Sequence, residues 1–171
     1  MSDRFDVAAR QAQGRPAVQD IQTYVQASHA LGYAHPDLTA HDSQVRDWYD
    51  ADAGLDLRVL DNDSAELLAA VRAIEEALWL QRAQVSQLAA AWAGPGADSA
   101  TSYLQRHCDA AAEVARRVRA AADGYAALRD HLWQVIDDKT ATTIAIDDRS
   151  QAQRSAWLAA AHSVITRAAD S

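Results

Sequence analysis

Several features that define common protein classes are missing from this sequence. It contains a single cysteine, Cys108, so no disulfide can form within the chain and cysteine usage does not indicate a redox compartment. No run of about 18 apolar residues occurs, so no membrane-spanning helix is predicted. Lys139 is the only lysine and the net charge is -8, so the sequence offers no basic face for nucleic acid. Neither a transmembrane segment nor binding to nucleic acid is therefore expected.

Strand-forming patterns are also nearly absent, and nothing in the sequence resembles an N-terminal signal peptide. Residues 1–25 carry Asp, Arg and Gln throughout, unlike the apolar core of a signal peptide, so any export is expected to use a different route. The chain instead contains 40 alanines, and alanine loses no side-chain entropy in a helix. At 171 residues it is long enough for one domain with a core, and we expect that domain to be all-α.

The stretch 87–98 contains the clearest turn in the sequence. Pro95 lacks a donor N–H, and the flanking Gly94 and Gly96 tolerate positive φ, so a helix is expected to stop here and the chain to reverse. Apolar residues on both sides repeat in steps of four and three. They are Leu67, Val71, Ile74, Leu78, Val85, Leu88 and Trp92 before the turn, and Ala100, Leu104, His107, Ala111, Val114, Val118, Ala121, Tyr125, Leu128, Leu132 and Val135 after it. The two runs predict an antiparallel helical hairpin over about residues 62–138.

Trp92 and Gly94 form a Trp-x-Gly motif in this turn, and the small residues Ala97 and Ala100 open the second arm. A Trp-x-Gly turn between two helical arms resembles the WxG-motif family of type VII (ESX) secretion substrates and associated proteins. The resemblance covers roughly residues 62–138. It implies a helical protein that binds a protein partner, which is a second WxG-like hairpin, a secretion chaperone or the type VII machinery itself.

Members of this family typically carry a Tyr-x-x-x-Asp/Glu export signal after the second helix. Tyr125 is followed four residues later by Arg129, so it does not match this pattern. Trp133 and Asp137 have the same spacing at about the right distance beyond Trp92, with Trp in place of Tyr. The resemblance therefore marks Trp133 and Asp137 as a degenerate export signal.

Shorter elements are expected before the hairpin. Residues 1–15 are polar with no sustained period, which predicts a flexible N-terminal arm. Pro16 suits the first turn of a helix, and a modest apolar stripe then favours a helix over 16–31. Between 32 and 62 we expect an irregular connection that contains a short helix capped by Asp42. This connection is long for a loop, so it is a candidate for function.

The limits of the long helices are expected from capping patterns and helix-breaking residues. Asp63 with Glu66 forms a capping-box pattern, which predicts the start of a helix that runs to about the turn. The second arm is expected over 98–138, because the β-branched residues within 140–146 disfavour helix.

A last helix completes the expected fold. Asp147 or Asp148 can cap it, and its apolar residues repeat in steps of four and three up to the C-terminus. We expect the N- and C-terminal helices to complete the elongated hairpin to a four-helix bundle, in a single helical domain over 16–171.

Candidate catalytic and metal-binding residues are few. His29, His35 and His41 are six residues apart, whereas zinc ligands come in pairs about two to five residues apart, so a metal site is not expected. His107 and Cys108 are neighbours on a helix and diverge by about 100°, which disfavours a nucleophilic pair. We therefore expect no catalytic, cofactor-binding or metal-binding residue.

Three further patterns have ordinary structural interpretations. Residues 61–63 begin like a calcium loop, but Glu66 stands where that loop requires glycine, so a capping role is favoured. His107 is the polar residue of the second seam, and it is either a hydrogen-bonded or edge-exposed histidine or a pH switch. A small basic patch faces Glu113 at helical spacing and is expected to be partly neutralised. That patch consists of Arg116, Arg117 and Arg119.

Our first functional hypothesis is a non-enzymatic protein associated with type VII secretion that acts through helix–helix recognition. It would lie in the cytoplasm before export, and then outside the cell or at the cell envelope. Two alternatives stay open. One is the N-terminal export or interaction module of a larger effector or toxin whose catalytic part lies beyond Ser171. The other is a structural four-helix protein unrelated to secretion.

Overall fold

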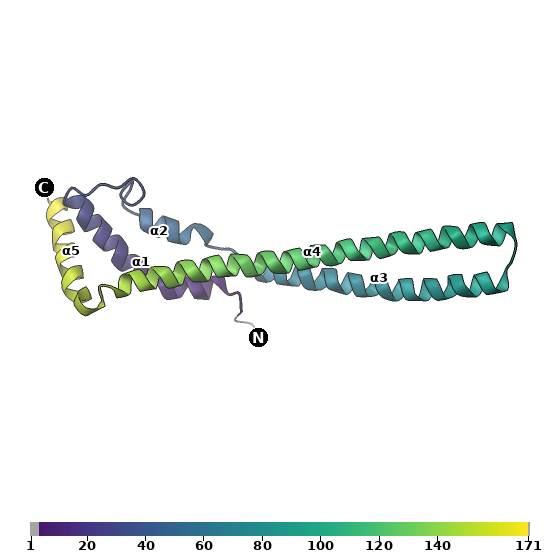
Figure 1. Ribbon diagram of the computed structural model, residues 1–171. Coiled ribbons are helices and arrows are strands. Elements are labelled where there is room, and N and C mark those ends of the chain that lie inside the picture. Colours follow the sequence, from purple (N-terminus) through teal and green to yellow (C-terminus); the bar gives the residue numbers. More distant parts are fainter. Residues whose placement is uncertain (1–3, 171) are drawn as a thin grey trace. The chain divides into compact units, whose positions relative to one another are not determined.

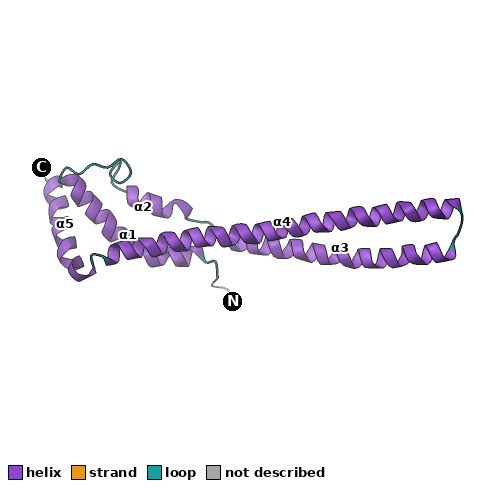
Figure 2. Cartoon of the chain, in the orientation of Figure 1, coloured by secondary structure: helices purple, strands orange, loops and turns teal. Residues whose placement is uncertain are grey.

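The computed structural model describes residues 4–170 of the chain (Figures 1 and 2). These residues form helices and connecting loops with no strand among them, which confirms the expected all-α class. In chain order the elements are α1 (Val7–Ala30), α2 (Gln44–Tyr49), the 3₁₀ helix η1 (Asp50–Asp52), α3 (Arg58–Ala91), α4 (Pro95–Asp148), the 3₁₀ helix η2 (Gln151–Gln153) and α5 (Arg154–Ala169).

The chain divides into two compact units. The hairpin unit comprises residues Arg58–His131, and the terminal unit combines Met1–Leu57 with Leu132–Ser171. Helix α4 contributes residues to both units, whereas α3 belongs to the hairpin unit alone. The contacts gather the two ends of the chain into a unit of their own. The single helical domain over 16–171 stays a prediction.

The turn between α3 and α4 forms where its residues predict it. Trp92 directly follows α3, and its N–H still donates to the carbonyl of Leu88 at 3.0 Å. Gly94 has a φ of +111°, which is costly for a residue with a Cβ atom, and Pro95 begins α4 at a position where no N–H is required. Gly96 lies inside the first turn of α4 and does not adopt positive φ. The predicted reversal of the chain is therefore confirmed.

In the hairpin unit α3 and α4 lie side by side and run in opposite directions (Figure 1). Near the start of α3, Ser64 Oγ donates to the carbonyl of Ala122 at 3.0 Å, and further along Arg119 Nη2 donates to Glu75 Oε1 at 2.7 Å. The buried residues of α3 recur every seven positions, and they are Ser64, Val71, Leu78 and Val85. Three of these belong to the apolar run that the sequence predicts for the first arm, so that seam is confirmed.

On α4 the buried seam lies one residue away from the predicted one. Cys108, Ala115 and Ala122 are buried, whereas His107 and Val114, which the apolar period assigns to the seam, are exposed. The apolar period predicts a seam made of the larger side chains of α4. The hairpin buries the smaller ones, because the large residues of the α3 seam already fill the space between the helices. The predicted register of α4 is therefore wrong at these positions, and Val114 is left outside.

Helix α1 begins at Val7 and contains Pro16 in its interior. The flexible arm expected over 1–15 is thus wrong from residue 7 onward, and its first three residues lie outside the described part of the chain. Asp6 caps the helix by accepting a hydrogen bond from the N–H of Ala9 at 2.9 Å. The buried face of α1 steps by four and three through Val7, Gln11, Gly14, Val18 and Gln22. Two glutamines and a glycine on this face hide the apolar period that would have indicated a helix.

Helix α4 does not stop where the sequence predicts. The β-branched residues within 140–146 stay helical, and α4 ends at Asp148. Thr140 is fully buried in the terminal unit, and the hydroxyl of Thr143 donates to the carbonyl of Lys139 at 2.8 Å. The burial of Thr140 and the backbone hydrogen bond of Thr143 favour the continued helix over the weak intrinsic helix propensity of these residues.

The starts of α3 and α5 also differ from expectation. Helix α3 begins at Arg58, so Asp63 and Glu66 lie within it and do not form a capping box. No glycine or proline separates Arg58 from Asp63, so the local sequence offers no reason for a later start. Helix α5 begins at Arg154 after η2, and the aspartates at the end of α4 do not cap it. The expected short helix is confirmed as α2, but its N-cap residue is Ser43 and not Asp42, and no side-chain hydrogen bond caps it.

A buried tyrosine connects α1, α2 and α4 within the terminal unit. Tyr49 Oη donates to the carbonyl of Gln11 at 2.8 Å and lies 3.3 Å from Thr140 Oγ1. Gly14 leaves room for this hydroxyl, because a Cβ atom built there would clash with Tyr49 Oη. Lys139 Nζ donates to the carbonyl of Tyr49 at 2.8 Å. These contacts fix α2 against the two longer helices.

Candidate interaction surface

The predicted turn motif lies at the end of the hairpin unit where α3 meets α4 (Figure 1). A Cβ atom placed on Gly96 would lie 3.5 Å from the Trp92 ring, so this ring lies next to the first turn of α4. Ala97 in the same turn is buried, while Trp92 remains 48% exposed. About half of the indole therefore supports the turn, and the other half is accessible to a partner.

The residues of the predicted export signal, Trp133 and Asp137, lie inside α4 because the helix continues to Asp148. Both are half-buried, and each contacts an N-terminal residue of the terminal unit. The Phe5 ring packs edge-on against Trp133, with centroids 5.8 Å apart and an interplanar angle of 88°. Arg10 Nε lies 2.6 Å from Asp137 Oδ1. A receptor that binds the side chains of Trp133 and Asp137 would have to displace the contacts with Phe5 and Arg10.

A line of large apolar side chains on α4 is exposed within the hairpin unit. These residues are Tyr103, Val114, Tyr125 and Leu128, here called the α4 stripe. The first three are eleven residues apart, which is about three helical turns, so they lie on nearly the same side of α4. Exposed apolar residues in line along a helix are typical of a surface that packs against another helix.

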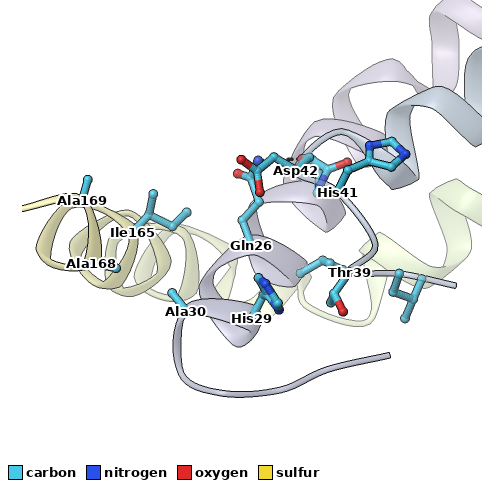
Figure 3. Close-up of a pocket in the computed structure, with 12 residues that line it drawn as sticks. Gln26, His29, Ala30, Thr39, His41, Asp42, Ile165, Ala168 and Ala169 are labelled. Carbon is cyan, nitrogen blue, oxygen red and sulfur yellow. Dashed lines mark hydrogen bonds between the residues drawn. The ribbon is translucent and has the colours of Figure 1, made fainter. Parts of the chain in front are cut away.

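A small pocket in the terminal unit brings together two of the histidines considered as metal ligands. Figure 3 shows Gln26 and His29 of α1, His41 and Asp42 of the following loop, and residues of α5 around a cavity of about 300 Å³. Gln26 Nε2 donates to the carbonyl of Asp42 at 2.8 Å, and His29 Nδ1 lies 3.0 Å from the carbonyl oxygen of Tyr33. Among the described residues, no group of three or more His, Cys, Asp or Glu side chains has a metal-binding arrangement. No metal is therefore assigned to this pocket.

The neighbours His107 and Cys108 have different surroundings. Cys108 is buried on the hairpin seam, whereas His107 is exposed. Only the Cys108 side chain lies on the seam. The two side chains therefore do not form a pair of a thiol and an adjacent base. His107 is thus not the buried seam residue that the apolar period predicts.

The basic patch on α4 is largely paired with carboxylates. Glu113 forms ion pairs with Arg116 and Arg117, and Arg119 pairs with Glu75 of α3. The hydrogen bond from Arg117 and the charge of Arg116 lower the pKa of Glu113. The patch therefore offers little free positive charge, which confirms the expected neutralisation by Glu113.

An ionisable cluster at the junction of α4 and α5 was not indicated by any sequence pattern. Asp147 is buried, and its Oδ2 lies 2.6 Å from Arg154 Nη2. Asp148 and Asp20 also lie close to this guanidinium, at 3.2 and 3.6 Å. Burial raises the pKa of Asp147, and the charge of Arg154 offsets this only in part. The cluster brings together residues of α1, α4 and α5 within the terminal unit.

Comparisons of the chain with protein-family models, with curated proteins and with solved structures found no match. Among the described residues, no helix combines the length and the apolar character needed to cross a membrane. The features that bear on function are therefore those of the chain itself, namely the Trp-x-Gly turn of the hairpin and the exposed α4 stripe.

Proposed function

We propose that this protein is a non-enzymatic component of type VII (ESX) secretion that acts through helix–helix recognition of another protein. The observation that carries the proposal is the position of Trp92 and Gly94 in the turn of an antiparallel hairpin. The family that the sequence resembles has its Trp-x-Gly motif in a turn of the same kind. The partner would be a WxG-like hairpin, a secretion chaperone or the type VII machinery.

The α4 stripe supports this proposal because it provides an apolar surface for a helix of the partner. Covering such side chains is favourable by roughly 25 cal/mol for each Å² removed from water. The completion of the hairpin to a four-helix bundle by the N- and C-terminal helices stays a prediction. In our proposal the stripe packs against the partner, so that a bundle forms between two polypeptides.

The contacts of Trp133 and Asp137 suggest how the export signal would be controlled. In this proposal the protein is made in the cytoplasm, and Phe5 and Arg10 cover the two signal residues there. Release of these contacts would expose both side chains to the secretion machinery. The protein would then be exported or held at the cell envelope.

Co-purification from a type VII-competent host tests the proposed surface. The tagged full chain is expressed together with the hairpin proteins of the host's type VII loci, and bound protein is quantified. Leu128→Asp places a charge on the stripe and should reduce co-purification by at least about tenfold. Ala127→Asp changes the adjacent exposed residue and should retain binding. If both variants bind like the wild type, or if none of these hairpin proteins co-purifies, the proposed surface is wrong.

A further inference from the structure

Another cavity of the terminal unit lies between α1, the end of α4 and α5. Its volume is about 230 Å³, which is below the roughly 300–1,000 Å³ that is typical of pockets for drug-sized ligands. Apolar side chains form much of its wall, among them Ile21, Val25 and Ile146. The cavity is therefore suited to a small molecule with an apolar body.

Three aromatic residues line this cavity, and contacts within the terminal unit hold each of them in place. Trp157 donates from Nε1 to Gln153 Oε1 at 2.8 Å, and its ring packs edge-on against Tyr24 with centroids 6.3 Å apart. The backbone N–H of Tyr33 donates to the carbonyl of Ser28 at 3.0 Å. Trp157 and Tyr33 are both about half exposed, so much of their aromatic surface remains uncovered.

A buried carboxylate also lines the cavity. Asp147 is 6% exposed, and its Oδ2 is paired with Arg154. Its Oδ1 is buried too and accepts no hydrogen bond from any residue in the described part of the chain. An unpaired carboxylate oxygen in the interior is costly, and most buried polar atoms have a partner. Asp147 Oδ1 is therefore available to a donor from outside the chain.

The ionisable residues around Asp147 carry an excess of negative charge. Asp147, Asp148 and Asp20 lie 2.6, 3.2 and 3.6 Å from nitrogen atoms of Arg154, so three carboxylates share one guanidinium. Arg149 also lines the cavity, but it is exposed, and water and salt screen its charge. A ligand with one positive charge would offset part of this excess.

We propose that this cavity binds a small organic ammonium ion, with its apolar body beside the aromatic residues and its N–H group directed towards Asp147. The face of an aromatic ring attracts a cation, and tryptophan does so most strongly. A hydrogen bond between an ammonium group and a carboxylate is also stronger than one between neutral groups. This binding goes beyond the proposed recognition of a protein by the hairpin and does not rest on it.

An NMR titration of the full chain at neutral pH with three probes of similar shape tests the site. Benzylamine, which is protonated at this pH, should cause saturable shifts with a dissociation constant of about 1 mM or lower. Its neutral counterpart benzyl alcohol should bind at least about tenfold more weakly, and the anion benzoate should bind more weakly still. The proposal is refuted if benzylamine causes no saturable shift, or if benzyl alcohol binds as well as benzylamine.

Asp147→Asn tests the contact with the carboxylate. This variant should bind benzylamine at least about tenfold more weakly, while its affinity for benzyl alcohol changes by about twofold or less. Asp148→Asn is the matched control, because Asp148 is exposed, contacts the same guanidinium and does not line the cavity. The control should bind benzylamine to within about threefold of the wild type. Equal losses in the two variants would refute the contact with Asp147.

Trp157→Leu tests the aromatic wall without changing any charge. The variant keeps an apolar side chain but should bind benzylamine at least about threefold more weakly. Because Trp157 is half exposed, the helical content measured by circular dichroism should stay the same. Trp48→Leu is the control, since Trp48 is similarly exposed in the terminal unit and does not line the cavity. Undiminished binding by Trp157→Leu, or an equal loss in Trp48→Leu, would refute the site and leave the proposed secretion function untouched.

Discussion

Gly14 is the residue at which a single added methyl group should be felt most strongly. Its missing side chain leaves space for the hydroxyl of Tyr49, which connects α1 with α2 and α4. Gly14→Ala should lower the free energy of unfolding by about 1–3 kcal/mol, because the added Cβ overpacks a buried position. Urea unfolding measures this change.

Gly124 provides the matched control for this substitution. It also lies inside a helix, but a Cβ atom there would meet no other atom within 4 Å. Gly124→Ala should therefore raise the free energy of unfolding by about 0.5–1 kcal/mol through helix propensity. Equal effects of the two substitutions would show that the space beside Tyr49 is not limiting.

Asp147 should make stability depend on pH in the direction opposite to that of an ordinary ion-paired aspartate. Its pKa in the folded protein is raised above the ordinary value of 3.8, because burial penalises the charged carboxylate. Between the unfolded and folded pKa values the folded protein binds more protons than the unfolded chain. The contribution of this group is therefore most favourable at low pH and declines as pH rises through the folded pKa.

Asp147→Asn removes this titration and tests the effect. Relative to the variant, the wild type should lose stability as the pH is raised from about 4 towards neutrality. Urea unfolding of both proteins over this range measures the difference between their free energies of unfolding. A difference that is constant with pH, or that grows in favour of the wild type, would contradict the assignment.

At the scale of the helix, the seam of α4 can be tested with two neighbouring residues. Ala115 is buried on the seam, whereas Val114 is 51% exposed. Ala115→Asp should lower the free energy of unfolding by about 3 kcal/mol or more, because an unpaired charge is buried. Val114→Asp should change it by about 0.5 kcal/mol or less. Thermal unfolding of both variants measures these changes. If Val114→Asp is the more destabilising of the two, the seam that the apolar period predicts is the correct one.

The long helices and their turn could be predicted because local residue chemistry determines them. Gly94 and Pro95 stop one helix and start the next, and the large residues of the α3 seam recur at heptad spacing. The seam of α4 could not be predicted in the same way, since small residues pack there for reasons that lie in α3. Thr140 stays helical because it is buried against Tyr49, a residue far away in sequence. The spacing of apolar residues along one helix reveals neither the packing against α3 nor the contact with Tyr49.

At the scale of the whole molecule, the candidate site was predicted only in part. The place of Trp92 in the turn follows from its sequence neighbours. The contacts at Trp133 and Asp137 do not, because Phe5 and Arg10 come from the other end of the chain. The surface between α3 and α4 depends on which small residues form the α4 seam. The predicted seam was one position away from the observed one, so this surface could not be predicted either.

The central claim is that the protein takes part in type VII secretion through its hairpin. The most direct measurement compares the amount of the tagged chain in culture medium and cell-envelope fractions of a type VII-competent strain and of the same strain without its secretion ATPase. We expect accumulation that requires the ATPase and that falls in Trp92→Ala, but not in Trp48→Ala, a comparably exposed tryptophan outside the hairpin. The same distribution with and without the ATPase would contradict the account.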